Sequence, residues 1–244
     1  MLNPMLAAIS RTLGPLGVLT VLGLASGDVS ALTISPVIVE LSPSRRVVSV
    51  TLINSSENAL SFQAEAVAWS QPDGHDHYEE TTDLMVVPPI AEIGAGATQI
   101  FRITTRTPPS SREQAYRVIL DDVTEETATQ PNSATVNIRV RHSLPVFVAA
   151  VGKPRTSARL GPCATPSRGG CVRLDNDGER YLVIKALTIE GGAERKEVQA
   201  GTRVLAGAWR EWSLDLPANS AGPLHVRVDT SAGAFTGEVP SSSR

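Results

Sequence analysis

The stretch ATVNIRVRHSLPVFV, residues 134–148, decides how the fold of this chain is interpreted. Up to His142 it alternates, because Val136, Ile138 and Val140 point to one side and the polar residues between them point to the other. A β-strand with one buried face has this period of two. A polar, proline-containing segment, TEETATQPNS, precedes the stretch. Periodicity alone predicts a half-buried strand, and by default its apolar face belongs to the protein's own core.

Short runs of the same kind fill the chain from Leu32 to residue 150. They are RRVVSVTLINSS, LSFQAEAVAWSQ, LMVVPPIAEI, TQIFRITTR and QAYRVILDDV, separated by polar, Gly- and Pro-containing turns. About seven short strands in roughly 115 residues is the count and spacing of an immunoglobulin-like sandwich. The first run, LTISPVIVEL, contains Pro36, and a proline inside a strand predicts an edge strand or a bulge.

Alternation stops at AAVGKPRTSARLGP, residues 149–162, and this break predicts a domain boundary after residue 150. A second series follows, with CVRLDNDG, RYLVIKALTIEGG and PLHVRVDTSAG among its runs. It also indicates a small antiparallel sandwich. No segment combines a long helical period with caps, so we expect little helix. The sequence predicts an all-β protein of two domains, residues 32–150 and 151–244.

The first 31 residues resemble a secretory signal peptide, with a weakly basic start, an apolar middle and VSA before the expected cleavage after Ala31. The alternative is an N-terminal membrane anchor. However, Gly and Pro interrupt the apolar run, which is shorter than the ~20 residues that a spanning helix needs. We therefore predict export and no membrane insertion of the mature chain. A net charge of −3 over 244 residues gives no reason to expect nucleic acid as a partner.

Two cysteines, Cys163 and Cys171, bracket the turn-rich segment ATPSRGG. In an exported chain, this spacing predicts a disulfide that staples a hairpin. A zinc site would need more ligands at suitable spacing, and none is nearby, so we expect no metal.

No set of catalytic residues rises above background. His75, Asp76 and His77 could suggest a metal site, but they lie in a polar, Gly-containing tip, where a solvated turn is the better interpretation. No serine lies in a G-x-S-x-G elbow, and no Gly-rich phosphate loop precedes a helix. We expect a binding protein that has no enzymatic activity and needs no cofactor.

Four arginines lie in the predicted strands of the first domain: Arg102, Arg117, Arg139 and Arg141. An arginine on a sheet face is usually a solvated outer residue, and this applies to each of them singly. Several arginines near a domain junction could instead bind a carboxylate, because guanidinium holds carboxylate with two hydrogen bonds. Glu113 could pair with one of them.

Five segments in order resemble the periplasmic chaperones of pilus assembly, the PapD-like proteins of the chaperone–usher pathway. They are ISPVIVELSP, VSVTLINSSENALSFQAEAVAW, DLMVVPPIAEIGAGATQIFRI, EQAYRVILDDV and VRHSLPVFV. The pairing of AYRVILDDV with RVRHSLPVFV looks most like the branch that serves archaic, spore-coat-U-like pili. The resemblance covers nearly all of the expected mature chain and is most specific over residues 84–148.

The resemblance implies two immunoglobulin-like domains in an L or boomerang shape. It also implies that the protein acts in the periplasm on a pilin, which is an incomplete sandwich with a hydrophobic groove and an unpaired sheet edge. The chaperone inserts the last strand of its first domain into that groove and delivers the subunit to an outer-membrane usher. Main-chain hydrogen bonds would contribute affinity, and alternate side chains would set the register.

Carried over position by position, the donor strand is residues 134–142. Its groove-filling side chains would be those of Val136, Ile138 and Val140. The first strand would pair with the subunit on the other side, and its residues are Ile34, Val37 and Val39. TEETATQPNS would be the flexible connection before the donor strand.

This chain departs from the better-known members at one site. Those members hold the subunit's C-terminal carboxylate with an arginine in the first strand and a lysine in the donor strand. Here the first-strand position is Ile38 or a close neighbour, and the only full cation near the lysine position is Arg141. The candidate substitutes are Arg102, Arg117, Arg139 and Arg141.

The alternative function is a structural or adhesive surface protein built of two sandwiches. Such a subunit would carry an extended N-terminal donor segment, whereas the expected mature N-terminus runs directly into a strand.

Overall fold

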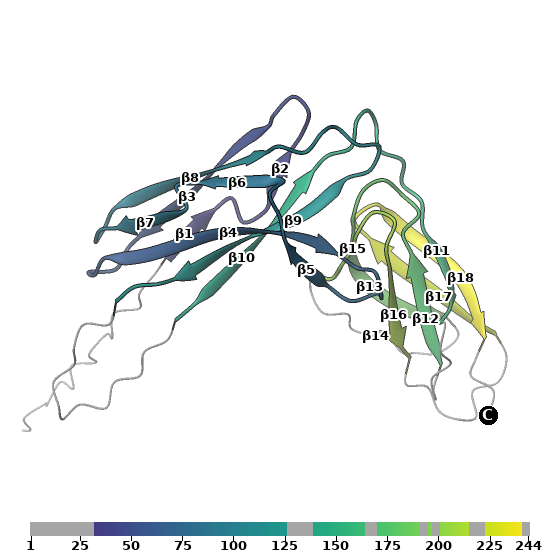
Figure 1. Ribbon diagram of the computed structural model, residues 1–244. Coiled ribbons are helices and arrows are strands. Elements are labelled where there is room, and N and C mark those ends of the chain that lie inside the picture. Colours follow the sequence, from purple (N-terminus) through teal and green to yellow (C-terminus); the bar gives the residue numbers. More distant parts are fainter. Residues whose placement is uncertain are drawn as a thin grey trace, which may run out of the picture.

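A computed structural model describes residues 32–125, 139–163, 170–190, 195–196, 201–214 and 223–240. The described chain forms strands and turns without any helix, in two arms that meet at a bend (Figure 1). One hydrophobic core draws on residues 39–148 and a second on residues 172–239. This confirms the prediction of an all-β chain with two immunoglobulin-like sandwiches in a boomerang arrangement. The boundary at residue 150 stays a prediction, and the predicted signal peptide lies outside the described residues.

Two sheets pack face to face in the first arm. The four-stranded sheet has the order β1-β3-β8-β6. Its strands are β1 (Leu32–Ser35), β3 (Val47–Asn54), β8 (Thr98–Thr105) and β6 (Leu84–Val87). The six-stranded sheet has the order β2-β10-β9-β4-β5, with β7 also paired to β4. Its strands are β2 (Val39–Leu41), β10 (Arg141–Val148), β9 (Gln114–Asp122), β4 (Leu60–Ser70), β5 (His77–Glu80) and β7 (Ile90–Ile93).

Pro36 divides the first predicted strand in two. β1 ends at Ser35 and pairs with β3, whereas β2 begins at Val39 and pairs with β10 in the other sheet. The chain therefore changes sheets at the proline, which has no N–H to continue a ladder. β1 and β2 are each the edge strand of their sheet, as the proline predicts.

The second arm has the same two-layer plan. One sheet has the order β11-β12-β16, with strands β11 (Arg159–Pro162), β12 (Cys171–Asp175) and β16 (Trp209–Ser213). The other has the order β14-β13-β17-β18, with β15 also paired to β13. Its strands are β14 (Arg195–Lys196), β13 (Leu182–Glu190), β17 (Pro223–Thr230), β18 (Gly233–Pro240) and β15 (Arg203–Val204).

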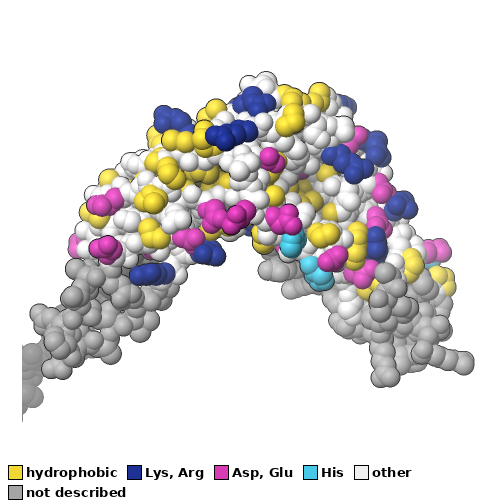
Figure 2. All heavy atoms as spheres, viewed as in Figure 1, with side chains coloured by type: hydrophobic (Ala, Val, Ile, Leu, Met, Phe, Trp, Pro, Cys, Tyr) yellow, Lys and Arg dark blue, Asp and Glu magenta, His cyan; other side chains and the backbone are white. Residues whose placement is uncertain are grey.

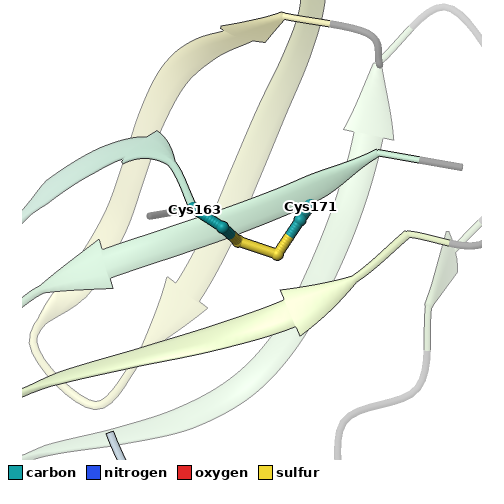
Figure 3. The surroundings of a disulfide bond; sticks show 2 residues. All are labelled: Cys163 and Cys171. Carbon is teal, nitrogen blue, oxygen red and sulfur yellow. A yellow bond between two sulfur atoms is a disulfide. The ribbon is translucent and has the colours of Figure 1, made fainter. Parts of the chain in front are cut away.

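A disulfide joins Cys163, which follows β11, to Cys171 at the start of β12 (Figure 3). Their Cα atoms are 5.7 Å apart, within the usual range for a disulfide. β11 and β12 are antiparallel neighbours, and the bond joins them at the end of the hairpin where residues 164–170 connect the two strands. Within the described ranges, no helix has the length and apolar composition to cross a membrane.

Candidate functional site

β10 has one edge that is only partly paired. It pairs with β9 along its whole length, but with β2 only over Val146–Val148. Among the described residues, the stretch 141–145 therefore has no strand partner on its second edge. An unpaired edge of this kind is a template for a strand from another chain.

Alternate side chains of β10 face the core, and this alternation continues toward the N-terminal end of the strand, where its edge is unpaired. Leu144, Val146 and Val148 belong to the core of the first domain. One step further out, His142 is half-buried, with its ring centroid 6.2 Å from that of the core residue Phe62. Val140 continues the period in sequence, and 47% of it is exposed. The series of side chains on the core-facing side thus continues through His142 to Val140, which the core does not cover.

The other residues predicted to contact a subunit have different environments. Val136 and Ile138 lie outside the described residues. Ile34 is half-buried against the core, and 61% of Val37 is exposed. Val39 is fully buried in the core, so at this position only the backbone of β2 could reach a partner. The roles of these residues stay predictions.

An apolar cluster joins the two domains at the bend. Trp69 of β4 and Phe147 of β10 pack with Leu205, which follows β15, and all three are buried. Tyr181 stacks on Phe147 with a centroid separation of 4.0 Å. Ile38 packs against the same cluster, so the position expected to hold the family's first-strand cation instead contributes apolar contact.

The turn between β4 and β5, residues 71–76, links the first domain to the second and is named here the junction loop (Figure 1). The buried Gln71 side chain donates to the backbone oxygen of Arg203 at 3.0 Å and accepts from the backbone N–H of Leu205 at 2.9 Å. Gly74 lies so close to Trp209 that an added Cβ would be 2.6 Å from the indole ring.

Asp76 is the charged group of the junction loop. Its carboxylate forms an ion pair with Arg210 of β16 and accepts hydrogen bonds from Trp69 Nε1 at 3.0 Å and Gln71 Nε2 at 2.7 Å. Burial alone would raise the pKa of this carboxyl, but the hydrogen bonds and the guanidinium charge hold it below its ordinary value. His75, Asp76 and His77 are all exposed, in keeping with the solvated tip that the sequence predicts, but Asp76 also forms these contacts, one of them to the second domain.

A cavity of about 300 Å³ lies beside this ion pair, at the boundary between the domains. The residues that line it are Trp69, Asp76, Arg117, Gly201, Thr202, Arg203 and Arg210. Three guanidinium groups and one carboxylate thus face a single space, named here the cation cavity. Asp76 neutralises Arg210, which leaves the charges of Arg117 and Arg203 to attract an anion.

Arg117 and Arg203 have unused hydrogen-bonding capacity. The Nε of each is buried and finds no acceptor among the described residues. Arg117 lies 4.3 Å above the Trp69 ring and donates from Nη1 to Ser143 Oγ at 3.1 Å, so its guanidinium is held in place. Both arginines also line the cavity, so N–H groups of their guanidinium groups that face it can donate to an anion there.

The other three candidate arginines do not line this cavity. Arg102 is exposed on the outer face of β8, in register with Ser49 of β3. Arg139 is exposed just before β10. Arg141 forms a two-hydrogen-bond ion pair with Asp121 of β9, and this carboxylate raises the pKa of Arg141. Of the four predicted arginines, only Arg117 reaches the domain junction.

Arg203 and Arg210 are functional candidates that the sequence analysis missed, because it considered arginines of the first domain only. They lie at the start of β15 and near the start of β16, in the segment TRVLAGAWREW. The signal available in the sequence was an arginine flanked by aromatic residues. Nothing in that pattern reveals that the segment faces the other domain.

On the face shown in Figure 2, acidic and basic side chains are interspersed over both arms.

Glu113 closes the opposite side of the junction. Its Oε1 accepts from the backbone N–H of Tyr181 at 2.9 Å, and Oε2 lies 3.7 Å from Nε of Arg180. Glu113 was predicted to pair with one of the four first-domain arginines, but the arginine beside it is Arg180, across the domain boundary. Burial, with a smaller contribution from the charge of Glu40, outweighs these favourable contacts and raises the pKa of Glu113 to about 7.

This raised pKa predicts that stability falls as pH rises. Because the carboxyl binds its proton more tightly in the folded state, its contribution is fully present below pH 4.5 and is lost as pH rises through about 7. The loss amounts to roughly 3 kcal/mol. Denaturant unfolding of the wild-type chain and of Glu113→Gln between pH 4.5 and 8 measures it. The variant should show a shallower fall than the wild type, and parallel curves would contradict the assignment.

Comparison with known proteins follows the same division of the chain. Residues 31–151 match the family model described as pili and flagellar-assembly chaperone, PapD N-terminal domain. A search of curated proteins found no match.

Three solved structures show the likeness in fold. The CsuC chaperone, in complex with the CsuE tip adhesion subunit from archaic chaperone–usher Csu pili of Acinetobacter baumannii, is similar at 20% identity with a TM-score of 0.64; the match covers 88% of this chain and 100% of that one. The structure of the SafA pilin with the SafB chaperone of Salmonella enterica is similar at 16% identity with a TM-score of 0.61. The match covers 86% of this chain and 97% of that one. The class 5 fimbriae chaperone CfaA is similar at 12% identity with a TM-score of 0.58, and the match covers 86% of this chain and 99% of that one.

Proposed function

Because its first domain, residues 31–151, belongs to the PapD N-terminal domain family of pili and flagellar-assembly chaperones, we propose that this chain is a periplasmic chaperone that binds pilin subunits by donor-strand complementation. The similar CsuC and SafB chaperones form complexes with a tip adhesion subunit and a pilin, respectively. By analogy, the partner of this chain is a subunit of a pilus, which it delivers to an outer-membrane usher.

The observation that carries this proposal is the open edge of β10. Its backbone over residues 141–145 has a free edge among the described residues, and its core-facing period continues to the exposed Val140. A subunit that lacks its last strand offers the matching features, which are an unpaired edge and an apolar groove. Backbone hydrogen bonds to β10 then contribute affinity, while Val140 and the residues before it fill the groove in a defined register.

The cation cavity would fix the position of the subunit along β10, because it can bind the subunit's C-terminus. The C-terminal carboxylate of the subunit is an anion that the guanidinium groups of Arg117 and Arg203, which line this cavity, can bind. Arg117 lies on β9 opposite Pro145, the residue at which the open edge of β10 ends. In this proposal Arg117 replaces the two-cation anchor of the better-known members, and Arg203 contributes from the second domain.

The chemistry needs no catalytic group and no nucleotide. The chaperone keeps a subunit soluble by covering its groove, and the subunit later exchanges the chaperone strand for a better-packed strand of the next subunit. The chaperone therefore acts as a binding protein whose complex with the subunit is an intermediate in assembly.

Co-expression with a pilin subunit from the same organism tests the proposal. We expect a soluble one-to-one complex and a pilin that is protected from protease, because an uncovered groove and edge would aggregate. Size-exclusion chromatography with mass determination gives the stoichiometry. If the pilin is equally soluble and protease-resistant without this chain, the chaperone function is wrong.

A further inference from the structure

The cation cavity is shared by the two domains. Trp69, Asp76 and Arg117 come from the first domain, whereas Arg203 and Arg210 come from the second. An anion held by Arg117 and Arg203 together is therefore held by both domains at once. Such an anion binds strongly only when the domains are docked, because separating them removes one of its two guanidinium partners.

The contacts that dock the domains are formed by the junction loop, and some lie outside the cavity. Gln71 makes two hydrogen bonds to the backbone of the second domain, at Arg203 and Leu205. Gly74, with a φ of 74°, lies against the Trp209 ring, and neither of these two residues lines the cavity. Docking can therefore be weakened at a point that leaves the cavity's own residues unchanged.

We infer that anion binding in the cation cavity and docking of the two domains are coupled, with the junction loop as the coupling element. The inference rests on the proposed function, since the natural anion there is the subunit's C-terminal carboxylate. Coupling is reciprocal: an anion that tightens docking by some factor is itself bound less tightly, by the same factor, when docking is lost. The domain junction thus regulates how firmly the chaperone holds its client.

One backbone group reports on docking directly. The N–H of Leu205 in the second domain donates to the Gln71 side chain of the first domain at 2.9 Å. Its hydrogen exchange requires this bond to open, so its exchange rate follows undocking. Inorganic sulfate serves as the anion probe, because it accepts hydrogen bonds from two guanidinium groups and does not depend on the pilin.

The experiment compares the full-length wild-type chain with Gly74→Ala, in which the new Cβ would push against Trp209. The matched control is Gly96→Ala, which has a similar φ of 66° but no atom within 4 Å of the added Cβ. Arg117→Ala tests whether sulfate occupies the cavity. Sulfate affinity is measured by calorimetric titration, and Leu205 exchange by NMR with and without saturating sulfate.

We expect saturating sulfate to slow Leu205 exchange in the wild type about tenfold, and we expect Gly74→Ala to speed this exchange in the absence of sulfate. Gly96→Ala should change neither, and Arg117→Ala should abolish sulfate binding. Coupling is overturned if sulfate binds but, at saturation, leaves Leu205 exchange unchanged both in the wild type and in Gly74→Ala. The site itself is overturned if the wild type does not bind sulfate or if Arg117→Ala binds it equally.

A second variant guards against misfolding of Gly74→Ala, and the pilin complex distinguishes failure of the coupling from failure of the chaperone function. If Gly74→Ala does not fold, Trp209→Ala loosens the same contact from the other side without altering a cavity-lining residue. Failure of the coupling would leave pilin binding through β10 intact. Failure of the chaperone function would instead appear as loss of the pilin complex while sulfate binding and its coupling persist.

Discussion

Val140→Asp is expected to abolish the complex between this chain and its pilin subunit while the free chain stays folded. Val140 is 47% exposed in the free protein, so a carboxylate there remains largely hydrated. In the complex the same carboxylate would be buried without a partner in an apolar groove, at a cost of several kcal/mol. We therefore expect affinity to fall about a hundredfold or more, measured by how well the variant displaces tagged wild-type chain from a purified complex with pilin.

Val47→Asp is the matched control. Val47 is 51% exposed at the start of β3, in the four-stranded sheet, which does not contain β10. The substitution adds the same charge. It should leave pilin binding and the melting temperature near their wild-type values. If Val140→Asp binds pilin as well as Val47→Asp does, the Val140 side chain does not fill the groove of the subunit. Strand donation through this face of the chain is then ruled out.

Arg117→Ala is expected to weaken pilin binding about thirtyfold or more. Truncating one partner of a buried, hydrogen-bonded charge pair typically costs 2–5 kcal/mol, because the other charge is left buried and unpaired. Arg117 is already held over Trp69, so little entropy is lost when it binds a carboxylate. Arg117→Lys should recover only part of the affinity, since an ammonium keeps the charge but not the planar pair of donors.

Arg102→Ala is the control for charge alone, because Arg102 is exposed on β8 and does not line the cavity. It should bind pilin like the wild type. A synthetic C-terminal pilin peptide with a free carboxylate or an amide completes the comparison. The wild type should prefer the carboxylate, and Arg117→Ala should lose most of that preference. An unchanged preference would retire Arg117 as the anchor.

Much of the fold could be predicted from local pattern. The period-two runs predict strands, and β9 covers Gln114–Asp122 inside the predicted run QAYRVILDDV. Pro36 predicts the edge at which the chain passes from one sheet to the other. These properties are local, since alternation and a missing N–H act on neighbouring residues. The disulfide between Cys163 and Cys171 is likewise suggested by eight residues of sequence separation.

The candidate site could be predicted only in part. The period of residues 134–148 predicts a half-buried strand and assigns its apolar face to the protein's own core, whereas the donor role comes from the family resemblance alone. In the structure that assignment is right for Leu144, Val146 and Val148, while Val140 lies beyond the core. Where the core ends depends on the length of the neighbouring strands, and no feature of β10 itself encodes it.

The sequence by itself determined the two-sandwich fold, and it predicted export, a donor strand and several arginines as candidates for binding an anion. Only the tertiary structure decided which arginines meet. Arg117 and Arg203 are far apart in the chain and come together because the junction loop docks one domain on the other. Local pattern depends on neighbouring residues, whereas a site between domains depends on how two folded surfaces pack. The sequence pattern of either domain alone does not contain that information.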